Sequence, residues 1–140
     1  MAERSLKKRI SQCNLKAAIV RPSIIFSCVN EPMVGWTDTL AASGGMMFGI
    51  SSGLMQYVPC DPTMIVDLVP CDFVSNLVIV AAVMTARSPD PILNIVHSTS
   101  SDIHPTTLGT FRDAGLSYVN KHPYNKQVFE PYTSALGNPS

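Results

Sequence analysis

With 140 residues, the chain has room for one domain with a single core. Its ten basic and ten acidic residues cancel, so it has no net field to attract nucleic acid, and a nucleic-acid partner is not expected. Only 14% of the residues are charged, against about 25% in typical soluble domains. So little charge predicts that part of the surface is covered by further sequence, a partner or a membrane.

The first predicted elements are a helix over residues 1–12 and a buried strand over residues 15–20. In the helix, two apolar positions lie one turn apart among basic residues, and Asn14 suits the position that ends it. The strand is a short apolar run. Arg21-Pro22 is expected to end it, because proline cannot donate to a ladder.

Further along, apolar periodicity and turn residues alternate. The strongest helical pattern covers residues 72–86, and Asp72 can cap that helix. Pro105 suits the first turn of a last helix that ends near Lys121. The other expected elements are a loop over residues 27–38, a helix over 39–48, strands over 54–58, 64–69 and 92–96, and an irregular tail after Pro123. This alternation predicts an α/β fold, with too few strands for a full doubly wound sheet.

The uncharged segment over residues 39–60 is long enough to cross a bilayer as a helix. Its four glycines, three serines and Pro59 favour a buried helix followed by a strand instead. The four cysteines contain no Cys-x-x-Cys pair and the three histidines no His-x-x-x-His pattern, so no metal site is expected. The start of the chain shows no secretory signal, which predicts reduced thiols in a cytosolic compartment.

Three motifs carry the candidate site. Arg21-Pro22-Ser23 follows a predicted strand, at the edge where open α/β sheets bind ligands, although a purely structural turn is the alternative. Gly35-Trp36 places the only tryptophan in a loop. There it either plugs the space under the loop or forms the aromatic wall of a cleft. Asp67, Pro70 and Asp72 form a third motif, which receives a structural role because a helix cap explains Asp72 more simply than acid–base chemistry does.

Two other patterns give little support for a nucleotide-binding loop or a hydrolase site. The glycines between residues 44 and 53 match neither the Gly-x-Gly-x-x-Gly pattern nor a P-loop. His97 lies beside several serines, but the Gly-x-Ser-x-Gly turn of a hydrolase nucleophile is absent from the sequence.

In their order and separations, the three motifs resemble the C-terminal half of a fatty acyl-CoA reductase domain, an extended short-chain dehydrogenase/reductase. Residues 94–98 and 104–109 are similar to later segments of that family, so the resemblance covers nearly the whole chain. The family shows Pro-Gly-Trp where this chain has Val34-Gly35-Trp36, and it often has a lysine where this chain has Ser51-Ser52.

The resemblance implies an incomplete Rossmann-like domain with its substrate-binding region over residues 1–122, and an irregular tail or linker over residues 123–140. It implies NADPH as the cofactor and a long-chain acyl-CoA as the substrate, which is reduced to a fatty aldehyde or alcohol. The cofactor contacts implied by the resemblance are Arg21, Pro22 and Ser23, and the substrate contacts are Ser23, Gly35 and Trp36.

The resemblance also implies that no catalytic residue lies in this chain. The glycine-rich nucleotide loop and the Tyr-x-x-x-Lys pair of the family are absent from the sequence, and both would precede Met1. The chain is therefore expected to lack the N-terminal half of its domain and to be inactive alone. The resemblance allows membrane association of the parent protein, at the peroxisome or endoplasmic reticulum and facing the cytosol. The alternative is a non-catalytic module, derived from such a reductase, that binds acyl chains or a protein.

Overall fold

The computed structural model describes residues 2–41, 43–58, 61–90, 92–125, 127–131 and 134–135. Helices and short strands alternate along this part of the chain, so the predicted α/β class is confirmed. The helices are α1 (Ala2–Cys13), α2 (Ser43–Ser51), α3 (Cys71–Arg87) and α4 (Leu108–Lys121). The strands are β1 (Ala17–Pro22), β2 (Ile24–Phe26), β3 (Tyr57–Val58), β4 (Ile65–Val66), β5 (Leu68–Pro70), β6 (Leu93–Ser98), β7 (Thr106–Thr107) and β8 (Ser134–Ala135).

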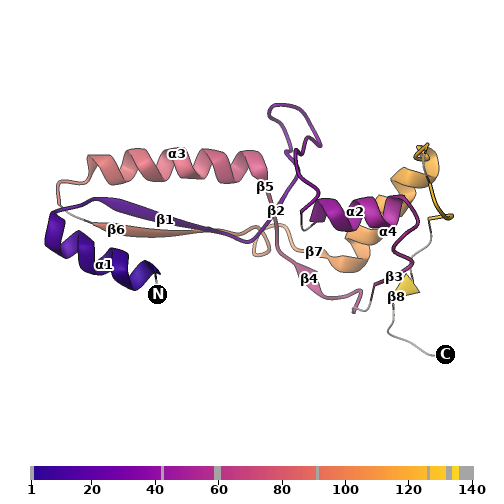
Figure 1. Cartoon of the computed structure of the whole chain (residues 1–140), viewed down its shortest axis with the longest axis horizontal. Helices are drawn as coiled ribbons and strands as arrows, with labels where there is room; N and C mark the ends of the chain where they lie inside the picture. Colours follow the sequence, from indigo (N-terminus) through magenta and orange to yellow (C-terminus); the bar gives the residue numbers. More distant parts are fainter. Residues whose placement is uncertain are drawn as a thin grey trace.

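The elements form two groups at opposite ends of an elongated molecule (Figure 1). At one end, α1 and α3 lie on opposite sides of the β1–β6 pair, and at the other end α2 packs against α4. The short β2–β5 pair lies between the two groups. The carboxyl ends of β1 and β6 therefore lie near the middle of the molecule.

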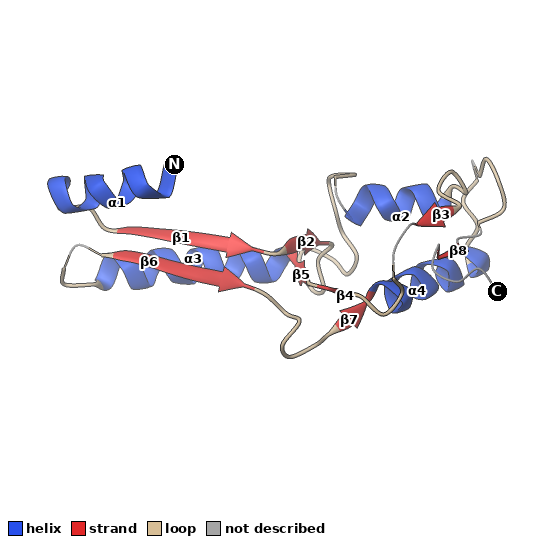
Figure 2. Cartoon of the chain, turned by 90° about the horizontal axis from the view of Figure 1, so that it is seen from below, coloured by secondary structure: helices blue, strands red, loops and turns tan. Residues whose placement is uncertain are grey.

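Every pair of strands in the described residues is short, and three of the four pairs are parallel. Only Ser23 separates β1 from β2, so one nearly continuous strand pairs first with β6 and then with β5 (Figure 2). β5 runs directly into α3, which returns the chain to β6. Ser23 therefore marks the point where the strand exchanges one partner for another.

The first two predicted elements are confirmed with one correction. Asn14 has a φ of 53°, as expected of a residue that ends a helix. The strand ends at Pro22, as predicted, but it includes Arg21 and Pro22, and Pro22 lies opposite Ser98. The N–H of Ala17 donates to Ile92, just before β6, and that of Ser23 donates to Ser98 of β6, so alternation turns the nitrogen of Pro22 away from that partner. Proline at this position therefore removes no hydrogen bond to β6.

The predicted strand over residues 64–69 is two strands, divided at Asp67. β4 pairs with β7 in an antiparallel manner, whereas β5 pairs with β2 in parallel. Apolar periodicity cannot show such a change of partner, because both halves are equally apolar. The strand expected over residues 54–58 shortens to β3, and that over residues 92–96 is confirmed as β6 with a shift toward the C-terminus.

Two predicted helices begin later than expected. α2 starts at Ser43 instead of residue 39, because the Thr39 hydroxyl accepts from the N–H of Ala41 (3.1 Å) and holds a local turn. Pro105 lies before α4 and not in its first turn, since Thr107 is the N-cap and its hydroxyl accepts from the N–H of Thr110 (3.1 Å). The predicted end of this helix at Lys121 is confirmed.

The uncharged segment forms α2 and β3, as the composition of the segment suggested. No helix among the described residues is long and apolar enough to cross a membrane. Pro59, Cys60 and most of the tail beyond residue 131 lie outside the described residues, although β8 in that tail pairs with β3.

The outer face of α3 is apolar and exposed. The helix buries Ala81 and Thr85 against the β1–β6 pair. Its exposed apolar side chains include Phe73, Ile79, Val80, Val83 and Met84. A patch of this kind is typical of a surface that other protein covers.

The small core at the other end depends on Phe111 of α4. Its side chain is 7% exposed and meets the ring of Phe26 edge to face, with 5.5 Å between the ring centroids. We expect Phe111→Ala to lower the free energy of unfolding by about 3–5 kcal/mol, through lost burial and a residual cavity. Phe73→Ala, at a side chain 53% exposed, is the control and should cost less than about 1 kcal/mol. Equal losses in chemical denaturation would contradict this assignment of the core.

Candidate functional site

A largely apolar cleft of about 390 Å³ opens beside Ser23. Its walls come from β2, from the loop that follows β2 and from the start of α2. The lining residues are Ser23, Ile24, Ile25, Phe26, Ser27, Trp36, Thr37, Asp38, Thr39, Ala41, Ser43, Gly44 and Cys71. The cleft thus lies at the carboxyl end of β1, where ligands bind in open α/β sheets.

Ser23 takes its position from the change of strand partner. Its N–H donates to the carbonyl oxygen of Ser98 on β6 (3.0 Å), whereas the next N–H, that of Ile24, donates to Asp67 (3.1 Å). The hydroxyl oxygen of Ser23 is buried and makes no hydrogen bond of good geometry. It lies near enough to the Asp67 carboxylate to lower the pKa of that group slightly, but it is not well satisfied there, which makes it a candidate for contact with a ligand.

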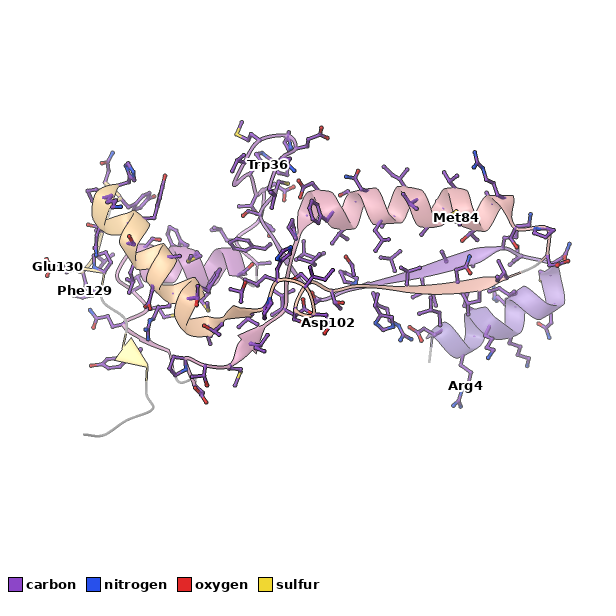
Figure 3. All side chains as sticks on the ribbon, turned by 180° about the vertical axis from the view of Figure 1, so that it is seen from behind. Arg4, Trp36, Met84, Asp102, Phe129 and Glu130 are labelled. Carbon is purple, nitrogen blue, oxygen red and sulfur yellow. The ribbon has the colours of Figure 1, made fainter. Side chains whose placement is uncertain are left out.

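Trp36 lies at the end of a loop that closes on itself and projects from the body of the molecule (Figure 3). Cys28 N–H donates to the Trp36 carbonyl (3.0 Å), and Gly35 N–H donates to the Cys28 carbonyl (2.8 Å). Gly35 has a φ of 79°, a conformation that favours glycine. The Trp36 side chain lines the cleft and is 38% exposed. The structure therefore brings Ser23 and Trp36 to one cleft, and their roles in binding substrate stay predictions.

Asp72 holds this loop against α3. Its buried carboxylate accepts from three consecutive backbone N–H groups, those of Val29 (3.3 Å), Asn30 (2.9 Å) and Glu31 (3.3 Å). Burial alone would raise the pKa of Asp72, but these donors together outweigh it and lower the pKa below its usual value. The carboxylate is therefore held in its charged form by the loop.

The prediction that Asp72 caps α3 is wrong. The N-cap is Pro70, which has no side-chain cap, and Asp72 lies within the first turn. It still accepts from the N–H of Phe73 (3.2 Å), so it serves the helix end and the loop together. The sequence suggested a helix cap because Asp72 lies at the start of the predicted helix. The loop that Asp72 also contacts is about 40 residues away along the chain, so the sequence pattern did not show it.

Asp67 fastens the point where the strand partners change. Its carboxylate accepts from the Ser100 N–H (2.8 Å) and from the hydroxyls of Ser100 (3.2 Å) and Ser101 (3.1 Å). The Ser100 N–H lowers the pKa of Asp67 most, burial opposes it, and the hydroxyls of Ser101, Ser100 and Ser23 add to the lowering. The structural role predicted for Asp67 therefore has a definite geometry: it joins the end of β6 to the start of β5.

The other predicted site residues lie outside the cleft lining. Arg21 is paired with Glu3 of α1, its Nε 3.0 Å from a carboxylate oxygen, and both side chains are exposed. Pro22 is exposed, Pro70 lies at the end of β5, and Gly35 shapes the loop without lining the cleft. The roles predicted for Arg21 and Pro22 in cofactor binding stay predictions.

Sequence analysis missed the floor of the cleft. Ile24, Ile25 and Phe26 form β2, which was not predicted, although their apolar and β-branched character is the signal of a short strand. A helix was expected from residue 39, but its place in the wall of the cleft was not predicted: the Ser43 hydroxyl of α2 donates to the Ile25 carbonyl (3.3 Å). A side chain at Gly44 would lie 2.8 Å from the Thr39 carbonyl oxygen, so glycine lets the preceding turn approach α2 closely.

The described residues do not form a cradle for a dinucleotide. β1 is followed by β2 and not by a helix N-terminus, so it lacks the strand–turn–helix arrangement that binds a pyrophosphate. β5 does run into α3, but the Asp72 carboxylate occupies that helix end and would repel a phosphate. Among the described cleft residues, the Ser23 hydroxyl is the group best suited to touch a reacting centre.

We expect Asp72→Asn to destabilise the fold in a pH-dependent way. Because the pKa of Asp72 is lowered in the folded state, its carboxylate contributes stability above its unfolded pKa near 3.8, and this contribution is lost as the pH falls through the folded-state pKa. The variant should therefore unfold at lower denaturant than the wild type at about pH 7, and the difference should shrink on acidification. Asp102→Asn, at an exposed carboxylate, is the control. A difference independent of pH would contradict the assignment.

Comparison with known proteins identifies relatives over most of the chain. Residues 1–78 match the family described as "Male sterility protein", an NAD-binding family. The chain is 31% identical over 118 residues to fatty acyl-CoA reductase 2 of Mus musculus, which covers 84% of this chain and 23% of that protein. It is 34% identical over 111 residues to fatty acyl-CoA reductase 1 of Arabidopsis thaliana, which covers 79% of this chain and 22% of that protein.

The chain spans less than a quarter of the length of the curated relatives it matches. The NAD-binding family suggests a Rossmann-like fold and a nicotinamide cofactor, and the relatives are oxidoreductases by name. The resemblance carried by the three motifs is thereby confirmed, and the chain belongs to the male sterility family of NAD-binding domains found in fatty acyl-CoA reductases.

Proposed function

We propose that the chain contributes the substrate side of an NADPH-dependent fatty acyl-CoA reductase, which reduces a long-chain acyl-CoA to a fatty aldehyde or alcohol. The observation that carries this proposal is the apolar cleft at the carboxyl end of β1, which is lined by both Ser23 and Trp36. The names of the relatives support the same substrate class.

The chemistry of the cleft suits an acyl thioester. Ile24, Ile25 and Phe26 offer an apolar surface on which methylene groups lose contact with water. The Ser23 hydroxyl, which makes no hydrogen bond of good geometry within the chain, can donate one to the thioester carbonyl, where negative charge develops during reduction. In this arrangement NADPH would supply the hydride, and groups outside this chain would supply the proton.

The same proposal covers the organisation and location of the protein. Residues 1–122 form the C-terminal part of a Rossmann-like reductase domain, and residues 123–140 form a tail or linker. The remaining parts of the domain pack against this chain. The parent protein faces the cytosol, on the membrane of the peroxisome or endoplasmic reticulum.

We expect long-chain acyl-CoA to change the fluorescence of Trp36, the only tryptophan in the chain, because the acyl chain replaces water beside the indole. Ile25→Asp should weaken binding at least tenfold, since it places a charge in the apolar cleft, where the side chain is 43% exposed. Ile79→Asp is the matched control, on the outer face of α3 and 62% exposed. If Ile79→Asp weakens binding instead, the acyl chain binds the apolar face of α3 and the cleft is not the site.

We expect no acyl-CoA-dependent oxidation of NADPH by the 140-residue chain alone. The sequence lacks a glycine-rich nucleotide loop and a Tyr-x-x-x-Lys pair, and proton transfer by such a pair contributes roughly 10²–10⁴-fold to a rate. The measurement is NADPH absorbance with and without acyl-CoA, on a protein whose mass has been verified. Turnover in that assay would mean that the catalytic groups lie within this chain.

A further inference from the structure

We propose that Trp36 determines the length of acyl chain that the cleft accepts, by separating the cleft from a second hollow. This inference rests on the proposed function, because it takes an acyl chain as the occupant of the cleft. It gives Trp36 a specificity-determining role in addition to its place in the wall of the cleft.

Two hollows meet at the Trp36 side chain. The first is the cleft of about 390 Å³ beside Ser23. The second has a volume of about 500 Å³ and lies between the Trp36 loop and the start of α3. Its lining residues are Cys28, Glu31, Pro32, Trp36, Cys71, Asp72, Ser75 and Asn76. Trp36 and Cys71 are the two residues that line both hollows.

The second hollow has an apolar floor beneath a polar rim. Cys28 is buried, and burial raises the pKa of its thiol, so that Cys28 behaves as a small neutral side chain. The Asp72 carboxylate is occupied by the loop N–H groups. Glu31, Ser75 and Asn76 are exposed and form the rim. An alkyl chain that passed Trp36 would therefore continue along the apolar floor made by Cys28 and Cys71, with Pro32 exposed at the rim.

The indole ring is the part of Trp36 that forms the partition. The loop is held by backbone hydrogen bonds between Cys28 and residues 35 and 36, and by Asp72, none of which involves the indole. Truncation of the side chain should therefore join the two hollows while the loop keeps its course. An acyl chain that ends against the indole in the wild type could then extend further.

The test is the affinity of the 140-residue chain for saturated acyl-CoAs of increasing length, measured by isothermal titration calorimetry, which does not depend on tryptophan. In the wild type, each methylene buried in the cleft should tighten binding by about fourfold, up to a limiting length beyond which affinity no longer rises. In Trp36→Ala and Trp36→Leu, the limiting length should move to longer acyl chains. Trp36→Phe keeps an aromatic wall and should shift the limit least.

Val34→Ala is the matched control, because Val34 lies in the same loop, is 80% exposed and lines neither hollow. Its limiting length should equal that of the wild type. If Trp36→Ala and Trp36→Leu bind more weakly but keep the same limit, Trp36 is only a contact and the inference is overturned. If the folded wild type binds no acyl-CoA of any length, the proposed function itself fails. Trp36→Leu keeps an apolar side chain in the loop, so the test survives if Trp36→Ala does not fold.

Discussion

A change of strand partner at Ser23 organises this molecule. The Ser23 N–H makes the last bond to β6 and the Ile24 N–H makes the first bond on the other side, to Asp67 just before β5, so β1 pairs with β6 and β2 pairs with β5. Asp67 stabilises the separation from the other side, because its carboxylate gathers Ser100 and Ser101 as the chain leaves β6. The opening between diverging strands is the place where an open α/β sheet admits a ligand. Strand pairing thus places Ser23 and β2 along the cleft, whose other lining residues come from the Trp36 loop, the start of α2 and Cys71.

A second carboxylate, that of Asp72, holds the loop that forms the wall of the cleft. Asp72 lies in the first turn of α3, where the helix dipole favours a negative charge, and its oxygens face the N–H groups of the loop. The loop and the helix start are therefore linked by one buried anion, which has backbone donors and no cationic partner among the described residues. This arrangement fixes the Trp36 loop beside β2 while the loop itself makes few apolar contacts. Strand pairing sets the floor of the cleft and charge–dipole contacts set its wall.

The sequence predicted the regular elements better than it predicted their partners. The end of α4 at Lys121 and the stop at Asn14 follow from local chemistry, and both were found. The division of residues 64–69 at Asp67 and the long-range contacts of Asp72 depend on segments far away in the chain, which periodicity does not report. Of the candidate site, Ser23 and Trp36 were found in one cleft, whereas β2 and the start of α2 were missed. Motifs located the site, and only the tertiary structure showed what encloses it.

The three positions of the Val34-Gly35-Trp36 motif differ in how much the structure depends on them. This chain has Val34 where the family shows proline, and Val34 is exposed and lines neither hollow. The turn forms without proline, since Gly35 supplies the positive φ and its N–H closes the loop onto Cys28. Proline would restrict the unfolded loop, whereas glycine makes the folded turn possible. The conformation of the loop therefore depends on Gly35, the partition of the cleft depends on Trp36, and position 34 can vary without altering either.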